Sequence, residues 1–167
     1  MANPIVNVIN RLKTDATLVG TLGPTGYSGI LQGGVWDRPL RRDPGPGQTV
    51  DAFYEAGVRG RMIRPSIVVV DRGDAPHPQE EAIYTAYRQD CYVYFYAPAT
   101  TSGKNSIYAA QGRVKQLLHY WRFQTDDGPW ASVDYVGRLG VYDNEEFIGS
   151  VMDYSRYQIT SRFSDEV

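Results

Sequence analysis

The chain has few residues of the kinds that build disulfides, metal sites or strongly charged surfaces. Its single cysteine, Cys91, excludes an intrachain disulfide framework and a multi-cysteine zinc site. Its two histidines, His77 and His119, fall on a proline-flanked loop and on the polar side of a predicted helix, which makes a poor metal site. We therefore expect no metal and no other cofactor. A formal net charge of −2 lacks the concentrated positive charge that tight binding of nucleic acid requires.

Long apolar stretches are also missing. No apolar run approaches the roughly 20 residues of a membrane span, and the N-terminus does not have the basic-then-apolar pattern of a signal peptide. We expect no membrane partner and a protein that stays soluble in a reducing cytosol. The 167 residues are enough for one domain with its own core. Within that core we expect Cys91, which lies among Val93 and Phe95, to be a small buried hydrophobe.

No catalytic motif is present. A phosphate-binding G-x-x-x-x-G-K-[ST] loop is absent, and "GYSG" at 26–29 misses the spacing of a nucleophile elbow. Asp126-Asp127 and Glu145-Glu146 could act as general acid and base, but they lie in polar loops where such pairs are ordinarily solvated. We expect no catalytic residues and no enzymatic activity.

Hydrophobic periodicity predicts a mixed order of helices and strands. The expected elements are a helix from Asn3-Pro4 with an apolar stripe at Ile5, Val8, Ile9 and Leu12, a helical turn from Thr14-Asp15 to Gly20 or Gly23, a short strand at 33–40, a strand at 64–71 followed by a loop at 72–80, a strand at 81–99, a helix at 103–124 capped by Ser102, and strands at 131–143 and 149–163. Neighbouring strands joined by hairpins, with one long helix between two such pairs, indicate an α+β fold. We expect a single domain over 1–167, with a mainly antiparallel sheet and both the long helix and the N-terminal helix on one face.

The strand at 81–99 has an unusual second face. One face is apolar up to a possible bulge, and the other carries four tyrosines and two charged residues: Tyr84, Arg88, Asp90, Tyr92, Tyr94 and Tyr96. If the helices cover the apolar face, the tyrosine face has no intrachain cover, and it forms a patch larger than soluble monomers usually expose. Either another segment, for which 41–62 is long enough, or another subunit must cover it. We favour assembly, because tyrosine is enriched at protein interfaces, and stacking on single-stranded nucleic acid would need more than one cation here.

Residues 41–62 contain the turn-rich "DPGPG" and a locally basic set, Arg41, Arg42, Arg59 and Arg61. This stretch is either a solvated surface loop or an arm that reaches a partner or a surface lined with DNA.

In its order of elements, the chain resembles the tail terminator (tail completion, or head–tail joining) proteins of long-tailed bacteriophages. The likeness covers most of the chain and is carried by "VINRLKTDATLVGTLG" leading into "GGVWDRPL", by "RPSIVVVDRGD", by "CYVYFYAPATTSGKNSIYAAQGRVKQLLHYW", and by the closing "YSRYQITSRF". The stretch at 41–62 departs from the shorter members of that family. Adaptor and neck proteins of the same viruses have a similar pattern.

The resemblance implies a virion protein, assembled in the host cytoplasm, that forms a homomeric ring, commonly a hexamer, at the head-proximal end of the tail. Such a ring caps the tail tube, contacts the neck or connector protein, lets double-stranded DNA pass through its lumen and has no catalytic activity. A closed ring needs two different contact surfaces on each subunit. We expect Arg88, Tyr92, Tyr94 and Tyr96 to form one subunit contact, and Arg41, Arg42, Arg59 and Arg61 to face a partner or the lumen. The alternative is a head-completion adaptor or stopper of the same neck.

Overall fold

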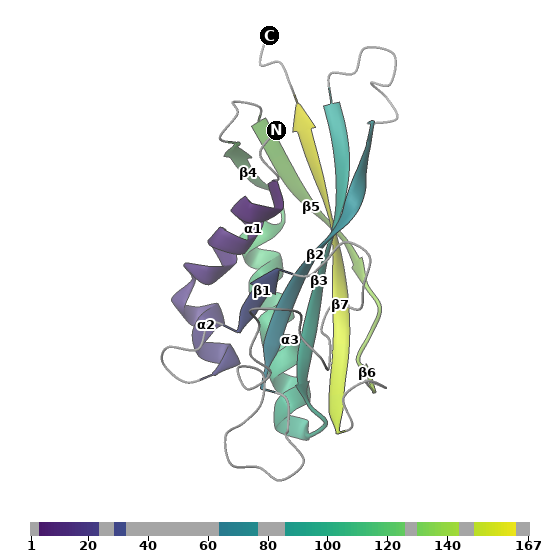
Figure 1. The fold of residues 1–167 in the computed structure, drawn as a ribbon. Coiled ribbons are helices and arrows are strands. Elements are labelled where there is room, and N and C mark those ends of the chain that lie inside the picture. The colour runs from purple at the N-terminus through teal and green to yellow at the C-terminus, as the bar shows by residue number, and fades with distance from the viewer. Residues whose placement is uncertain are drawn as a thin grey trace, which may run out of the picture.

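A computed structural model describes residues 4–23, 29–32, 64–76, 86–125, 130–143 and 149–162 (Figure 1). The elements are α1 (Pro4–Lys13), α2 (Ala16–Leu22), β1 (Ile30–Gln32), β2 (Ser66–Pro76), β3 (Ala86–Pro98), α3 (Thr101–Leu118), β4 (Trp121–Gln124), β5 (Trp130–Arg138), β6 (Tyr142–Asp143) and β7 (Ser150–Arg162). The α+β prediction is confirmed. The predicted strand at 33–40 and the arm at 41–62 lie outside the described residues.

The strands form one sheet in the order β1-β2-β3-β7-β5-β4, and β6 also pairs with β7. The β1–β2 pair is parallel, and the other described pairs are antiparallel. The two strands at the centre, β3 and β7, have 13 residues each and pair over their whole length, from Ala86 opposite Arg162 to Pro98 opposite Ser150. Figure 1 shows α1, α2 and α3 on one side of this long, twisted sheet.

The N-terminal helices form as their sequence patterns predict. Helix α1 begins at Pro4. The backbone N–H of the first helical residue has no intrahelical acceptor, so proline, which lacks this N–H, is well suited to the position. The whole apolar stripe predicted for α1 is buried. Asp15 caps α2, because its Oδ1 accepts a hydrogen bond of 2.8 Å from the backbone N–H of Leu18. Gly23 ends the helix.

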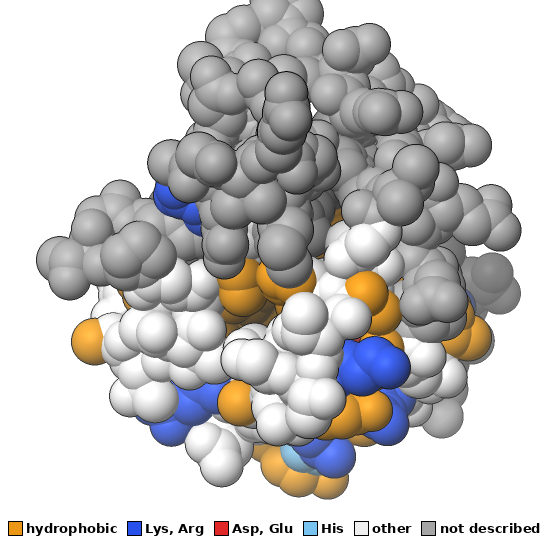
Figure 2. Space-filling model, turned by 90° about the horizontal axis from the view of Figure 1, so that it is seen from below, with side chains coloured by type: hydrophobic (Ala, Val, Ile, Leu, Met, Phe, Trp, Pro, Cys, Tyr) orange, Lys and Arg blue, Asp and Glu red, His pale blue; other side chains and the backbone are white. Residues whose placement is uncertain are grey.

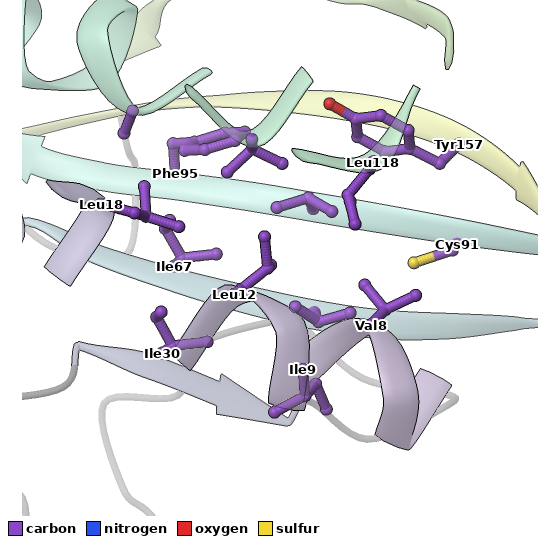
Figure 3. Packing of buried hydrophobic residues seen from close by; sticks show 14 of the residues in the cluster. Val8, Ile9, Leu12, Leu18, Ile30, Ile67, Cys91, Phe95, Leu118 and Tyr157 are labelled. Atoms are coloured by element: carbon purple, nitrogen blue, oxygen red, sulfur yellow. The ribbon is translucent and has the colours of Figure 1, made fainter. Parts of the chain in front are cut away.

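The main core lies between the helices and the sheet. It contains the stripe of α1, the inward residues of α3, and the apolar odd-numbered residues of β3 and β7, several of which Figure 3 labels. The stripe predicted for the helix at 103–124 is Ile107, Ala110, Val114, Leu117, Leu118 and Trp121. Four of these residues are buried in α3, Leu117 is partly buried against the core, and Trp121 lies in β4. In β3 the alternation is strict: Cys91, Val93 and Phe95 all point into this core.

Helix α3 is shorter than predicted, and its predicted cap is wrong. Thr100 rather than Ser102 is the N-cap, with its Oγ1 3.0 Å from the N–H of Gly103. The helix ends at Leu118 because Tyr120 has a φ of 62°, which reverses the chain into β4. Trp121, expected in the helix, therefore stacks on Phe123 from β4, with ring centroids 4.3 Å apart.

Two strand boundaries also differ from the prediction. Strand β2 continues through the expected loop to Pro76, with a bulge between Asp71 and Asp74 where Gly73 has a φ of 92°. The expected strand at 131–143 is divided near Gly140, which has a φ of 118°. Its second part becomes β6, which pairs with the same strand as β5.

Candidate assembly surface

We call the side of the sheet away from the helices the second face. It carries the even-numbered residues of β3 and β7, from Arg88 to Tyr96 and from Met152 to Arg162. The prediction that the tyrosines of β3 share this side is therefore confirmed for Tyr92, Tyr94 and Tyr96, whereas Tyr84 lies outside the described residues.

The prediction that these tyrosines form an exposed patch is wrong for two of them. Tyr94 is 6% exposed and Tyr96 is 3% exposed within the single chain. Together with Val68, Val70 and Met152 they form a second apolar cluster. In the register, Val68 and Tyr154 flank Tyr94 on the neighbouring strands, and Met152 lies opposite Tyr96. Of the three tyrosines, only Tyr92 is half-buried.

Tyr92 and Tyr94 belong to what we call the tyrosine cluster: Tyr92, Tyr94 and Tyr154 with Arg72. Tyr154 lies opposite Tyr94 in the register, and its ring is 5.3 Å from both of the other rings. Arg72 donates a hydrogen bond of 2.6 Å to the Tyr94 hydroxyl, and its guanidinium lies over the rings of Tyr92 and Tyr94 at 5.2 and 5.8 Å. The cluster is therefore held in place by contacts within the subunit.

A partly satisfied ion pair lies beside this cluster. Arg156 is 3.6 Å from Asp90, and its guanidinium lies 5.4 Å from the centre of the Tyr92 ring. Asp90 Oδ1 and Arg156 Nε are buried without a hydrogen-bond partner among the described residues. Buried polar atoms are nearly always hydrogen-bonded, and leaving one unpaired costs about 1–3 kcal/mol.

Two residues of this surface, Tyr154 and Arg156, were not predicted as contact residues, although the sequence contains a signal for them. Tyr154 and Arg156 alternate in the closing strand in the same way as Tyr92 and Tyr94 do in β3. The apolar residues on the opposite face of that strand predict the strand itself but not this site. Arg72 has no such signal, because its position depends on the bulge in β2.

Further along the second face, three arginines lie where β3, β7, β5 and β4 run side by side. Arg122 is opposite Ser132, which is opposite Thr160, which is opposite Arg88, so the four residues form one row across four strands. Arg162 lies in the next row, opposite Trp130. We call these six residues the arginine corner. Arg88, one of the predicted contact residues, thus belongs to this corner and is separated from the tyrosine cluster by Asp90.

The helix layer contains polar contacts that fix the fold. Arg113 in α3 binds the carboxylate of Asp15 with bonds of 3.0 and 2.6 Å, and this guanidinium holds the pKa of Asp15 below its usual value. His119 Nδ1 accepts a hydrogen bond of 3.0 Å from the backbone N–H of Tyr135. Lys115 lies 4.2 Å from the centre of the Tyr135 ring. Figure 2, which views the molecule from below relative to Figure 1, shows hydrophobic and basic side chains next to one another on that surface.

Other titratable groups are buried among apolar side chains. Cys91 is fully buried, as expected, and burial raises the pKa of its thiol. Burial likewise raises the pKa of the Tyr157 hydroxyl. Asp153 is also fully buried, and it accepts hydrogen bonds of 2.8 Å from both Gln111 and the backbone N–H of Gly140. These groups support packing and have no access to a substrate.

Among the described residues, no group of three or more histidine, cysteine, aspartate or glutamate side chains could hold a metal ion. Within the same ranges, no helix has the length and apolar character needed to cross a membrane. The predicted partner residues Arg41, Arg42, Arg59 and Arg61, and both acidic loop pairs, lie outside the part of the chain that the structure describes.

No protein-family model matches the chain, and no curated protein matches it significantly. Among solved structures, the chain is similar to a chain from the virion of a native gene transfer agent particle. The TM-score is 0.49 and the sequence identity is 14%, over 97% of this chain and 100% of that chain. A similarity of this size assigns neither a family nor a function to the protein.

Proposed function

We propose that the chain is a structural, non-catalytic subunit of a phage-type virion that assembles into a homomeric ring through the second face of its sheet. The sequence resemblance supports the head-proximal end of the tail as the place of this ring, between the tail tube protein and the neck. Assembly would then take place in the host cytoplasm, and double-stranded DNA would pass through the lumen. The arginines at 41–62 would contact the neck or line the lumen.

One observation supports the assembly surface above all. The second face holds Asp90 Oδ1 and Arg156 Nε, which are buried and have no hydrogen-bond partner in the described part of the subunit, beside the half-buried rings of Tyr92 and Tyr154. A neighbouring subunit can supply the missing donor and acceptor and cover the two rings at the same time. Tyrosine and arginine are also the residues that most often dominate the binding energy of interfaces.

The burial of Tyr94 and Tyr96 changes their proposed role. Because both rings are almost inaccessible, they support the surface from below, while Tyr92, Tyr154 and Arg156 would make the contacts. The proposed interface is therefore more polar than the exposed tyrosine patch that the sequence predicts. An interface of this kind is sensitive to salt, because exposed charges are screened.

Size-exclusion chromatography with light scattering tests the proposal. The full chain is measured from micromolar to near-millimolar concentration, at low and at high salt. We expect one closed oligomer at high concentration and low salt, with a lumen wide enough for duplex DNA in electron micrographs. Tyr92→Asp should remain folded but monomeric. Tyr108→Asp is the matched control, because Tyr108 is 47% exposed on α3, on the other side of the sheet, and this variant should assemble normally.

Two results would refute the proposed interface. The first is a strict monomer under every condition that also fails to bind isolated phage tails. The second is a Tyr92→Asp variant that assembles as well as the unmodified chain. Binding of labelled protein to phage heads rather than to tails would instead favour the adaptor or stopper role.

A further inference from the structure

The arginine corner is the part of the second face in which the described residues offer the positive charges no ion-pair partner. No ion pair to Arg88, Arg122 or Arg162 is formed by the described residues. Other described arginines are engaged: Arg11 with the Leu117 carbonyl and the Trp121 ring, Arg72 with Tyr94, Arg113 with Asp15, Arg138 with Gln111, and Arg156 with Asp90. Within the described part of the chain, the guanidinium groups without an ion-pair partner are thus gathered at one place rather than scattered.

The surface at the arginine corner is also concave. A hollow of about 440 Å³ is lined by Arg122, Trp130, Ala131, Ser132, Thr160 and Arg162. Two hydroxyl groups, from Ser132 and Thr160, therefore lie between arginines on both sides. Trp130 is 45% exposed and adds an apolar wall. Guanidinium and hydroxyl groups together form a site for an oxyanion, and arginine binds a carboxylate with two parallel hydrogen bonds.

We propose that the arginine corner binds an acidic peptide segment of a partner protein, one that presents carboxylates beside an apolar side chain. The row from Arg122 to Arg88 crosses three strand spacings of about 4.8 Å, or about 14 Å in all. In an extended peptide, residues i and i+4 point to the same side and are about 13 Å apart. Two carboxylates at this separation would reach both ends of the row, and the side chain between them would lie near Trp130.

Duplex DNA fits the corner less well. A hollow of this volume holds a few side chains rather than a stretch of duplex, and the exposed ring of Trp130 gives it an apolar wall that suits an apolar side chain. Binding to a duplex is also driven by many neutralised phosphates, and a chain with a net charge of −2 gives little long-range attraction to a polyanion. This inference goes beyond ring formation and does not depend on it.

The probes are fluorescein-labelled peptides and a labelled 20-base-pair duplex, titrated with the full chain and followed by fluorescence anisotropy. The acidic peptide is Glu-Ser-Leu-Ser-Glu, and its matched control is Gln-Ser-Leu-Ser-Gln. We expect the acidic peptide to bind with a Kd below about 1 mM and the glutamine peptide not to bind. Arg122→Gln and Arg162→Gln should each weaken binding about tenfold. Lys104→Gln removes the same charge from the exposed first turn of α3 and should change the Kd less than about twofold.

Each other outcome overturns the proposal. Equal binding of the two peptides, or no binding of the acidic peptide up to about 1 mM, would show that the corner does not recognise carboxylates. Unchanged affinity in both arginine variants would place the binding site elsewhere. Tighter binding of the duplex than of the acidic peptide, weakened by the same two substitutions, would identify nucleic acid as the occupant instead.

Discussion

Truncation of Tyr94 tests whether the tyrosine cluster is part of the subunit core. Tyr94 is 6% exposed, its ring contacts those of Tyr92 and Tyr154, and its hydroxyl accepts a hydrogen bond from Arg72. Replacing a buried aromatic residue by alanine typically costs about 3–5 kcal/mol. Because whole domains are stable by only about 5–15 kcal/mol, Tyr94→Ala should lose a large share of the free energy of unfolding. Tyr92→Ala, which truncates a half-buried ring in the same cluster, should cost only about 1 kcal/mol.

The assay is urea denaturation followed by far-ultraviolet circular dichroism, at a protein concentration low enough to keep the chain monomeric, since assembly adds to apparent stability. The free energies of unfolding of Tyr94→Ala and Tyr92→Ala are compared with that of the unmodified chain. Tyr94→Phe keeps the ring and removes only the acceptor for Arg72, so it should cost about 1 kcal/mol. A loss below about 1 kcal/mol for Tyr94→Ala, or equal losses at both tyrosines, would refute the burial of Tyr94 in the isolated subunit.

Three further predictions concern the helix layer and the core. Asp15→Ala should cost about 1 kcal/mol through loss of the α2 cap. Because Arg113 lowers the pKa of Asp15, the stability from this carboxylate is complete above its ordinary pKa near 3.9 and is lost as the pH falls through the lowered value. Urea midpoints measured below pH 4 should therefore fall less steeply with falling pH in the variant than in the unmodified chain. Gly103→Ala should cost about 1–3 kcal/mol in urea denaturation, because a Cβ there would collide with a backbone carbonyl of β3. The control Gly112→Ala, with open space around it in the same helix, should instead stabilise the chain by about 0.5–1 kcal/mol. Cys91 should react with Ellman's reagent only as the chain unfolds, since burial raises the pKa of its thiol, and immediate reaction of the folded chain would contradict this burial.

The elements with strong periodicity were predictable from the sequence. The stripe of α1 and the alternation of Cys91, Val93 and Phe95 in β3 each repeat over several residues, so their buried sides follow from the spacing alone. The same holds for the side of the sheet that carries Tyr92, Tyr94 and Tyr96.

Features that depend on one residue or on distant partners were not predictable. Nothing in the helical pattern marks Leu118 as the end of α3, because the break is made by the positive φ of Tyr120. The burial of Tyr94 depends on Val68 and Tyr154, which come from strands far away in the sequence. Periodicity gives the side of a sheet on which a residue lies, but not the size of the side chains that surround it. Those side chains decide how much of the residue is exposed.

This difference changes the physical character of the proposed assembly. An exposed patch of tyrosine rings would associate through burial of apolar area, which is strong and almost independent of salt. With Tyr94 and Tyr96 already buried, the second face presents half-buried Tyr92 and Tyr154 and an incompletely bonded Asp90–Arg156 pair. It also presents the arginine corner, whose guanidinium groups have no ion-pair partner among the described residues. Such a surface gains little from unspecific contact and much from a partner whose polar groups are correctly placed. It would therefore select its neighbours by charge and hydrogen bonding, and association should weaken as salt is raised.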